Sequence, residues 1–204
     1  MNFGSGDIAS QTWTHFYLSV LGTVAGGVIG LLLAIVCRKR PKLATFFMGI
    51  AEVIQTFPSI ALLAILLLVF GLGNTTLVVA LGLYGIMPVL QNTYEGLTSV
   101  DSVYLDIAKG MGMKPSQIFW RVELPMSIPV ILAGFRVSLV TSIGIATIGV
   151  FVGAGGLGVL IFRGLQILDN QLLLEGAIPA ALLAIVVELV MVYLEKRMSQ
   201  KYGK

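Results

Sequence analysis

Long, almost uncharged apolar runs alternate with short polar segments along this chain. Roughly 20 apolar residues in a helix span the ~30 Å hydrocarbon core of a bilayer, so each run of that length predicts one membrane crossing. The runs cover about 16–37, 43–70, 75–94, 128–152 and 177–194. We therefore predict an all-α integral membrane protein with five crossings, built as a single transmembrane domain over residues 1–204.

Proline and glycine are placed where they change two of these crossings. Pro58 lies inside the second run and removes a backbone donor, which predicts a kink or two half-helices. Gly22, Gly26 and Gly30 recur every four residues in the first run. Small residues at this spacing let helix backbones approach each other in lipid, so this face is expected to contact a neighbouring helix.

Composition and charge agree with a membrane protein and also orient it. Charged residues make up 11% of the chain and mean hydropathy is +0.96, values that the charged surface of a soluble domain would not permit. Loops on the cytoplasmic side of membrane proteins are enriched in Lys and Arg. Five crossings with the N-terminus outside and the C-terminus inside place eleven of the 13 basic residues on the cytoplasmic side: Arg38, Lys39, Arg40, Lys42, Lys109, Lys114, Arg121, Lys196, Arg197, Lys201 and Lys204.

The polar interlude at 101–125 has the pattern of two short helices joined by glycine. Asp101 can cap the first helix, and Gly112 stands where a left-handed residue would end it. Pro115 suits the first position of a second helix that reaches Glu123 and stops at Pro125. We predict a cytoplasmic helix–glycine–helix elbow that projects from the membrane domain.

The elbow also carries a specific spacing of residue types. Asp-Ile-Ala at 106–108 is followed after three residues by Gly112, and after nine more by Val-Glu-Leu-Pro at 122–125. This spacing resembles the EAA signature of inner-membrane permeases of ATP-binding-cassette (ABC) importers. Asp replaces Glu, Ile replaces the first Ala and Val replaces Ile, and these changes keep the charge or the apolar character.

The resemblance implies that the elbow is the coupling helix that docks in a cleft of a cytoplasmic ATPase. Carried over residue by residue, the coupling positions are Asp106, Ile107, Ala108, Lys109, Gly110, Gly112, Val122, Leu124 and Pro125. By the same resemblance Asp106, Ala108 and Gly112 form the docking turn, while Leu124 and Pro125 lead the chain back into the membrane.

The likeness extends from about Thr14 to Lys196 and includes the segments QTFPSIALLA, PVLQNTYEGL and FVGAGGLGVLIFRGLQ. These segments look like the small permeases of osmoprotectant importers, which carry glycine betaine, carnitine and choline. The resemblance implies a type I ABC importer fold in a bacterial-type cell membrane. It also implies a second permease subunit (identical or homologous), a cytoplasmic ATPase dimer that uses ATP and Mg²⁺, and an extracytoplasmic substrate-binding protein. The chain itself is then a transport subunit, not an enzyme, and binds no cofactor.

Two alternatives compete with this interpretation. The same machine could carry methionine or another amino acid. An ion-coupled secondary transporter belongs to a different class, and the sequence shows neither an inverted repeat of crossings nor a buried acidic pair for ion coupling.

Other motifs do not point to chemistry. The sequence Gly-Ala-Gly-Gly-Leu-Gly at 153–158 has the letters of a dinucleotide-binding fingerprint but follows a membrane helix and not a strand. We therefore interpret it as a turn or a re-entrant element on the outer face, near the external gate. His15 has no companions for a metal site and is expected at the membrane interface, beside Trp13 and Tyr17. The cytoplasmic clusters account for the basic charge, so no nucleic-acid partner is needed.

Polar or helix-breaking residues within the crossings are candidates for the transport pathway. They are Thr56, Pro58, Ser59, Thr141, Ser142, Thr147 and Glu188. Hydrogen bonds between helices, or pairing of the charge near the interface, would account for them equally well. The aromatic residues are too scattered to form a cage for a quaternary amine, so we expect substrate selection to occur in the binding protein.

Overall fold

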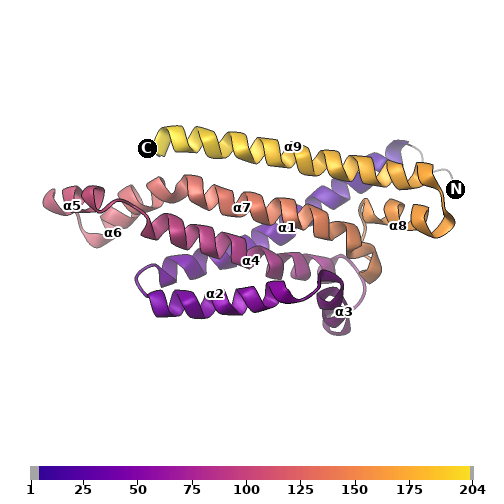
Figure 1. Ribbon diagram of the computed structural model, residues 1–204, viewed down its shortest axis with the longest axis horizontal. Coiled ribbons are helices and arrows are strands. Elements are labelled where there is room, and N and C mark those ends of the chain that lie inside the picture. The colour runs from indigo at the N-terminus through magenta and orange to yellow at the C-terminus, as the bar shows by residue number, and fades with distance from the viewer. Residues whose placement is uncertain (1–4, 203–204) are drawn as a thin grey trace.

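The computed structural model describes residues 5–202, and every regular element in that range is helical. Figure 1 shows a bundle in which the four long helices α1, α4, α7 and α9 run along the long axis. Their bounds are Ser5–Cys37, Asn74–Thr98, Leu124–Ala146 and Asn170–Tyr202. The shorter elements are α2 (Pro41–Thr56), α3 (Ser59–Phe70), α5 (Ser102–Gly110), α6 (Pro115–Ile118), the π-helix η1 (Phe119–Glu123), the 3₁₀-helix η2 (Thr147–Val152) and α8 (Gly158–Ile167).

The prediction of an all-α membrane fold is confirmed, and the predicted interruption at Pro58 is a break between two half-helices. The described residues contain four helical segments long and apolar enough to cross a membrane, and α2 with α3 form a fifth candidate bent by 98°. The run at 43–70 is therefore two half-helices and not one straight crossing. Pro58 separates them, and the Tyr84 hydroxyl of α4 donates to the freed Phe57 carbonyl at 2.6 Å.

The helices extend beyond the apolar runs that predicted them. α1 begins at Ser5 and α9 runs from Asn170 to Tyr202, because a helix continues through polar residues once its backbone bonds are formed. The run predicted at 128–152 divides: α7 begins at Leu124 and ends at Ala146, and the remaining residues tighten into η2.

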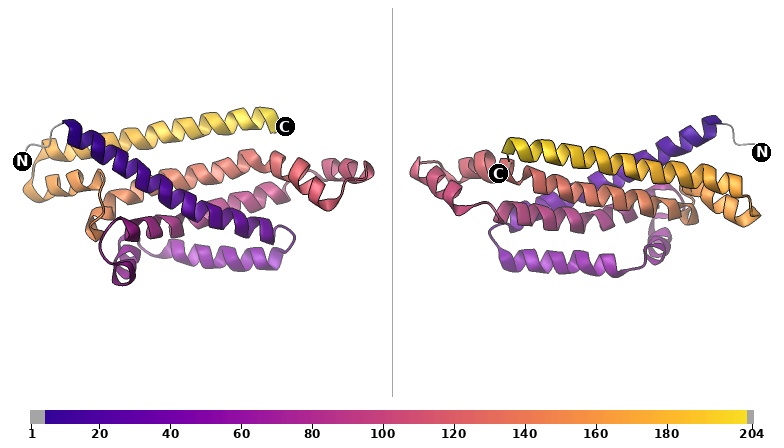
Figure 2. Two further views of the ribbon diagram at one scale, coloured as in Figure 1. Left: turned by 180° about the vertical axis from the view of Figure 1, so that it is seen from behind. Right: turned by 45° about the horizontal axis from the view of Figure 1, so that its top comes forward.

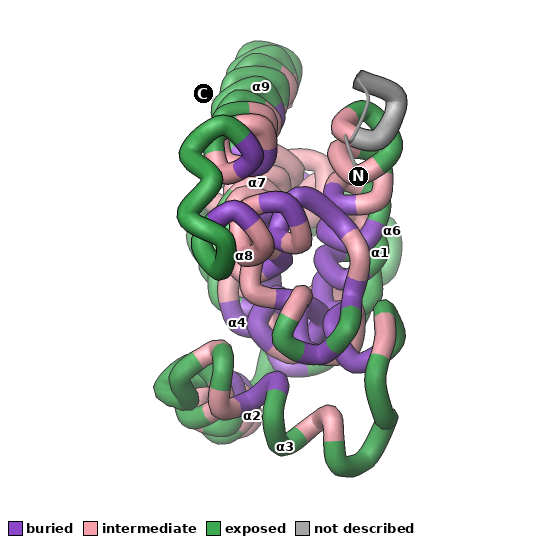
Figure 3. The backbone as a smooth tube through the Cα atoms, turned by 90° about the vertical axis from the view of Figure 1, so that its right-hand side faces the viewer, coloured by how far each residue is buried: buried purple, intermediate pink, exposed green. Residues whose placement is uncertain are grey.

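Helix α4 forms the centre of the bundle, and α9 lies at its edge. In the most apolar stretch of each helix, 56% of the α4 residues are buried but only 11% of those of α9. Figure 3 shows the same contrast, with the buried segments gathered around α4 and α1 and an exposed outer surface on α9. The predicted small-residue face is confirmed: Gly22, Gly26 and Gly30 of α1 lie against α4, where any added Cβ would collide with its atoms.

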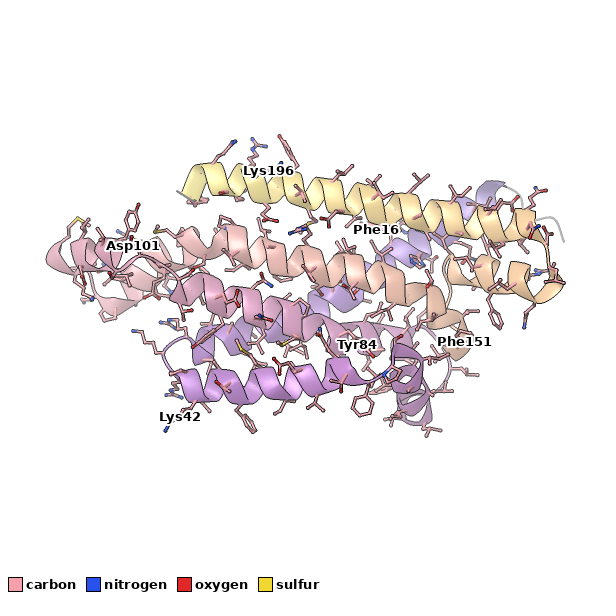
Figure 4. The ribbon with its side chains drawn as sticks, in the orientation of Figure 1. Phe16, Lys42, Tyr84, Asp101, Phe151 and Lys196 are labelled. Carbon is pink, nitrogen blue, oxygen red and sulfur yellow. The ribbon has the colours of Figure 1, made fainter. Side chains whose placement is uncertain are left out.

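The two ends of the bundle differ in shape and charge. The start of α1 and the end of α9 lie toward opposite ends of the bundle (Figure 1), and Figure 2 shows α5 and α6 projecting beyond the long helices. Lys42, Asp101 and Lys196 lie toward the end from which the elbow projects, whereas Phe151 lies toward the other (Figure 4). The fold thus places Lys42 and Lys196 toward the end that carries the elbow, although which side of the membrane this end faces stays a prediction.

Candidate functional site

The elbow comprises residues 101–125, and its first arm, α5, is a helix capped at both ends by residues of the elbow itself. The Asp101 carboxylate accepts a hydrogen bond from the Val103 N–H at 3.0 Å, as the sequence predicted. At the other end Gly112 has φ +76°, a left-handed conformation that favours glycine. The N–H groups of Gly112 and Met113 donate to the carbonyls of Lys109 and Ala108, at 2.9 and 3.1 Å. These two bonds form a Schellman turn, which fixes the direction of the chain after the helix.

The second arm joins the elbow to α7 without a break. Pro115 opens α6 as predicted, and the Lys114 N–H donates to the Gln117 side chain at 2.8 Å. The prediction that Pro125 stops this arm is wrong, because α6 continues through η1 into α7. At the end of η1 the Leu124 N–H donates to the carbonyl of Phe119, five residues earlier. This wider turn accommodates Pro125, which has no N–H, at the start of α7.

The elbow exposes apolar side chains and leaves its glycines uncovered. Ile107, Met111 and Trp120 are 55%, 69% and 64% exposed. A Cβ added at Gly110 or Gly112 would meet no atom of this chain within 4 Å. A groove of about 390 Å³ lies between the elbow, the start of α7 and the end of α9, lined by Tyr104, Arg121, Val122, Pro125, Met126, Lys201 and Tyr202. The arrangement offers a rigid knob with apolar contacts and a polar rim to a partner.

The motif residues divide into an exposed set and an anchoring set. Asp106 and Ile107 are exposed, and the Asp106 carboxylate pairs with Lys109 at 2.9 Å on the solvent side. Ala108 is buried at 1% exposure, so it packs the first arm against the rest of the elbow. Val122, Leu124 and Pro125 are half-buried in the segment that leads into α7.

The predicted pathway residues occupy three separate places. Thr56, Pro58 and Ser59 lie at the break between α2 and α3, and Thr56 bonds within its own helix to the Val53 carbonyl. Thr141 is exposed on α7, and Thr147 bonds to the Gly144 carbonyl. Ser142 is buried and accepts a hydrogen bond from Thr23 of α1 at 3.1 Å, the interhelical arrangement that the sequence left open.

Glu188 forms part of a charge cluster between α7 and α9. The Arg136 guanidinium donates to Glu188 at 2.6 Å and to Glu195 at 3.1 Å. The three side chains are 26%, 39% and 30% exposed. The structure therefore shows Glu188 in an ion pair, which is one of the two alternatives that the sequence left open.

The opposite end of α7 leads through η2 into the glycine turn, defined as residues 153–158. The Gly155 N–H donates to the Asn74 side chain of α4 at 3.0 Å, and the Gly156 N–H to the Gln11 side chain of α1 at 2.8 Å. The turn follows η2 and precedes α8, and the described part of the chain has no strand there. The sequence-based rejection of a dinucleotide site therefore agrees with the geometry.

His15 also belongs to this region, and it lies inside the bundle and not on its surface. The side chain is fully buried, and its Nε2 lies 3.0 Å from the Ile143 carbonyl of α7. Its position is set by close packing, because a Cβ on Gly156 would lie 3.0 Å from its Nδ1. The flanking Trp13 and Tyr17 are exposed, as the sequence suggested.

Sequence reasoning did not single out several side chains that the structure places at the elbow and at the glycine turn. Trp120 presents an exposed ring on the elbow, and a large aromatic residue amid charged positions was the available signal. Gln11 and Asn74 hold the glycine turn, but nothing in their local sequence marks that contact. Arg38 contacts η1, although the sequence showed only a member of a basic loop.

Comparisons with known proteins agree with this geometry. Residues 26–200 match the family described as binding-protein-dependent transport system inner membrane component. The glycine betaine/carnitine/choline transport system permease protein OpuCD of Bacillus subtilis is 42% identical over 195 residues, covering 95% of this chain and 85% of that protein. The choline transport system permease protein OpuBD of the same organism is 42% identical over 186 residues, covering 91% and 82%.

A solved structure shares the fold at lower sequence identity. The chain superposes on a permease chain of the MetNI methionine ABC transporter, in an inward-facing conformation, with a TM-score of 0.83. The match covers 94% of this chain and 95% of that chain at 20% identity, which shows the fold of a type I ABC importer permease. With the family match over most of its length, the chain belongs to the binding-protein-dependent transport system inner membrane components.

Proposed function

We propose that this chain is the permease subunit of an ATP-driven importer of quaternary-ammonium osmoprotectants: glycine betaine, carnitine and choline. The observation that carries the proposal is the elbow, whose EAA-like spacing coincides with an exposed, rigid helix–glycine–helix knob. The cargo class is supported by relatives that are named for these solutes and match nearly the whole chain.

ATP hydrolysis belongs to a separate subunit, and a separate binding protein delivers the substrate. An ATPase dimer that uses ATP and Mg²⁺ would receive the elbow, with the N-terminus of this chain outside and its C-terminus inside. This chain would bind no cofactor. A second permease subunit, identical or homologous, completes the pathway in this proposal.

The geometry supports a mechanical role for the elbow. Asp106, Ile107 and Gly112 are exposed, so a cleft in the ATPase would be able to reach them, and the second arm is continuous with α7. Movement of the docked elbow would therefore be passed directly to α7 as a lever. Differential affinity of the inward- and outward-open states for nucleotide and for the loaded binding protein supplies the driving energy.

Pathway residues are proposed at the break of the second crossing and along α7. Pro58 leaves irregular backbone at Phe57–Pro58, and such backbone in a membrane protein is tolerated where protein covers it or where it lines a water-filled cavity. Thr56 and Ser59 flank this break, and Thr141 and Thr147 follow α7 toward the glycine turn. Glu188 is held by Arg136, so it would act on the pathway only after the ion pair opens.

The test is ATP-dependent uptake by the reconstituted complex with its ATPase and binding protein. Radiolabelled glycine betaine, carnitine, choline and methionine are supplied to proteoliposomes holding the intact chain, Gly112→Asp, or the control Ser116→Asp on the second arm. We expect uptake of at least one quaternary amine, lost in Gly112→Asp and kept in Ser116→Asp. Uptake of methionine alone would overturn the cargo class, and uptake indifferent to ATP would overturn the importer.

A further inference from the structure

A single arginine at the end of α1 contacts the base of the elbow in two ways. The Arg38 guanidinium carbon lies 4.1 Å from the centre of the Phe119 ring, and its Nε lies 3.4 Å from a Glu123 carboxylate oxygen. Phe119 and Glu123 are four residues apart, so they share one side of η1. Arg38 therefore contacts two residues on one face of η1.

These contacts are shielded from water. The Arg38 and Glu123 side chains are 24% and 14% exposed, and Phe119 is 5% exposed. Cation–π contacts and ion pairs gain strength when water is excluded around them. A further hydrogen bond from Arg38 to the Ile35 carbonyl of α1, at 3.2 Å, fixes the arginine to its own helix.

Arg38 connects the elbow to helices that do not adjoin it in the sequence. The residue lies in the tight turn that joins α1 to α2, where the Arg40 N–H bonds to the Cys37 carbonyl at 2.7 Å. Through the chain itself, the elbow continues into α4 on one side and into α7 on the other. Arg38 adds a link from the elbow to α1 and α2, which lie far away in the sequence.

We propose that Arg38 is a positioning residue that fastens the base of the elbow to the α1–α2 turn, so that displacement of the elbow moves α1 and α2 together with α7. The inference rests on the proposed function of the elbow as the ATPase-coupling element. A planar guanidinium can stack on a ring and pair with a carboxylate at once, whereas a lysine can do so only poorly. The side-chain type therefore matters as well as its charge.

The experiment compares ATP hydrolysis with uptake in the same proteoliposomes. The complete complex carries the intact chain, Arg38→Ala, Arg38→Lys, Glu123→Gln or the control Arg40→Ala, which removes an exposed arginine from the same turn. Uptake is measured with radiolabelled glycine betaine, carnitine and choline. The readout is the number of solute molecules imported per ATP hydrolysed, which a loss of folded complex alone would leave unchanged.

Arg38→Ala is expected to hydrolyse ATP but to import about tenfold less solute per ATP, which corresponds to about 1.4 kcal/mol. Arg38→Lys and Glu123→Gln should lose about threefold, because each keeps part of the contact, and Arg40→Ala should match the intact chain. An unchanged ratio in Arg38→Ala, with an active intact complex, overturns this inference alone. If Arg38→Ala fails to assemble, unchanged ratios in Arg38→Lys and Glu123→Gln overturn it. An intact complex that imports none of the three solutes overturns the proposed function and this inference with it.

Discussion

Glycines occur near both ends of α7, and their surroundings at the two ends are opposite. At the elbow, the space around Gly110 and Gly112 is open, and the left-handed turn at Gly112 directs the chain outward. In the glycine turn, Gly156 lies against His15 and Gly158 against the carbonyl of Thr147, with no room for a side chain. The glycines of the elbow are therefore open to solvent, whereas those of the glycine turn are packed against other segments of the bundle.

The hydrogen bonds show the same difference. Polar groups of the glycine turn are satisfied by distant helices, through Gln11 of α1 and Asn74 of α4. The polar bonds of the elbow's first arm are local, such as those made by Asp101 and Asp106. A segment whose tertiary contacts are complete is part of the fold. We expect that one which is locally stable but exposes Ile107 and Trp120 is completed by a partner.

The largest effect on stability is expected when glycine is replaced by alanine in the glycine turn, and the same replacement in the elbow is the matched control. Gly158→Ala places a Cβ on the Thr147 carbonyl, and such overpacking should cost about 3 kcal/mol of stability. Gly110→Ala meets no atom of the chain within 4 Å and should leave stability unchanged or raise it by up to about 1 kcal/mol. Melting temperatures of the purified chain in lipid nanodiscs check this pair. Equal melting temperatures for the two variants would contradict the contrast between the ends.

The charge cluster between α7 and α9 should give the next largest effect. Arg136→Met leaves the carboxylates of Glu188 and Glu195 uncompensated near the membrane, at a cost of about 2 kcal/mol given their partial exposure. Neutralising all three, with Glu188→Gln and Glu195→Gln added, should restore most of this loss. Thermal unfolding monitored by circular dichroism measures both variants. A triple variant no more stable than Arg136→Met would show that charge pairing is not the cause.

A smaller effect on stability, with a large effect on transport, is expected at the elbow turn. Gly112→Val forces a β-branched residue into a left-handed conformation, a strain of about 1–2 kcal/mol that should redirect the second arm. Gly112→Asn tolerates this conformation better and is the matched control. ATP-driven uptake should fall about tenfold in Gly112→Val and less in Gly112→Asn. Similar losses in both would point to side-chain bulk at the docking surface and not to backbone geometry.

The smallest effect is expected for the polar contacts of the glycine turn. Gln11→Ala removes the acceptor of the Gly156 N–H and should lower stability by about 1 kcal/mol. Asn74→Ala should act similarly on Gly155. Because both bonds hold one turn, the double variant should deviate from the sum of the single effects. Strict additivity, measured by melting temperature, would mean that the two bonds act independently.

Much of the fold could be predicted because its signals are local. Apolar runs predicted the long helices, and Pro58 predicted the break between α2 and α3. The 98° bend at that break depends on packing against α4, and no local pattern encodes such an angle. The helix ends were missed for a related reason: hydropathy marks the lipid-facing length of a helix, while backbone hydrogen bonding decides where it stops.

The elbow could be predicted for the same reason, and its surroundings could not. Asp101, Gly112 and Pro115 act on the backbone of their immediate neighbours, so their roles are readable from the sequence. Pro125 was misread because η1 changes the register of backbone bonds just before it. The burial of His15 and the contact of Arg38 with η1 depend on packing between segments distant in the sequence, which a single sequence does not reveal.

We expect a partner to complete the elbow, whereas the chain itself completes the glycine turn. Amide hydrogen exchange in lipid nanodiscs, with and without the ATPase subunit bound, tests it most directly. We predict that ATPase binding slows exchange of the amides in α5 and the adjoining turn by at least about tenfold and leaves residues 153–158 unchanged. Elbow amides that exchange equally fast in the presence of the bound ATPase would contradict the account.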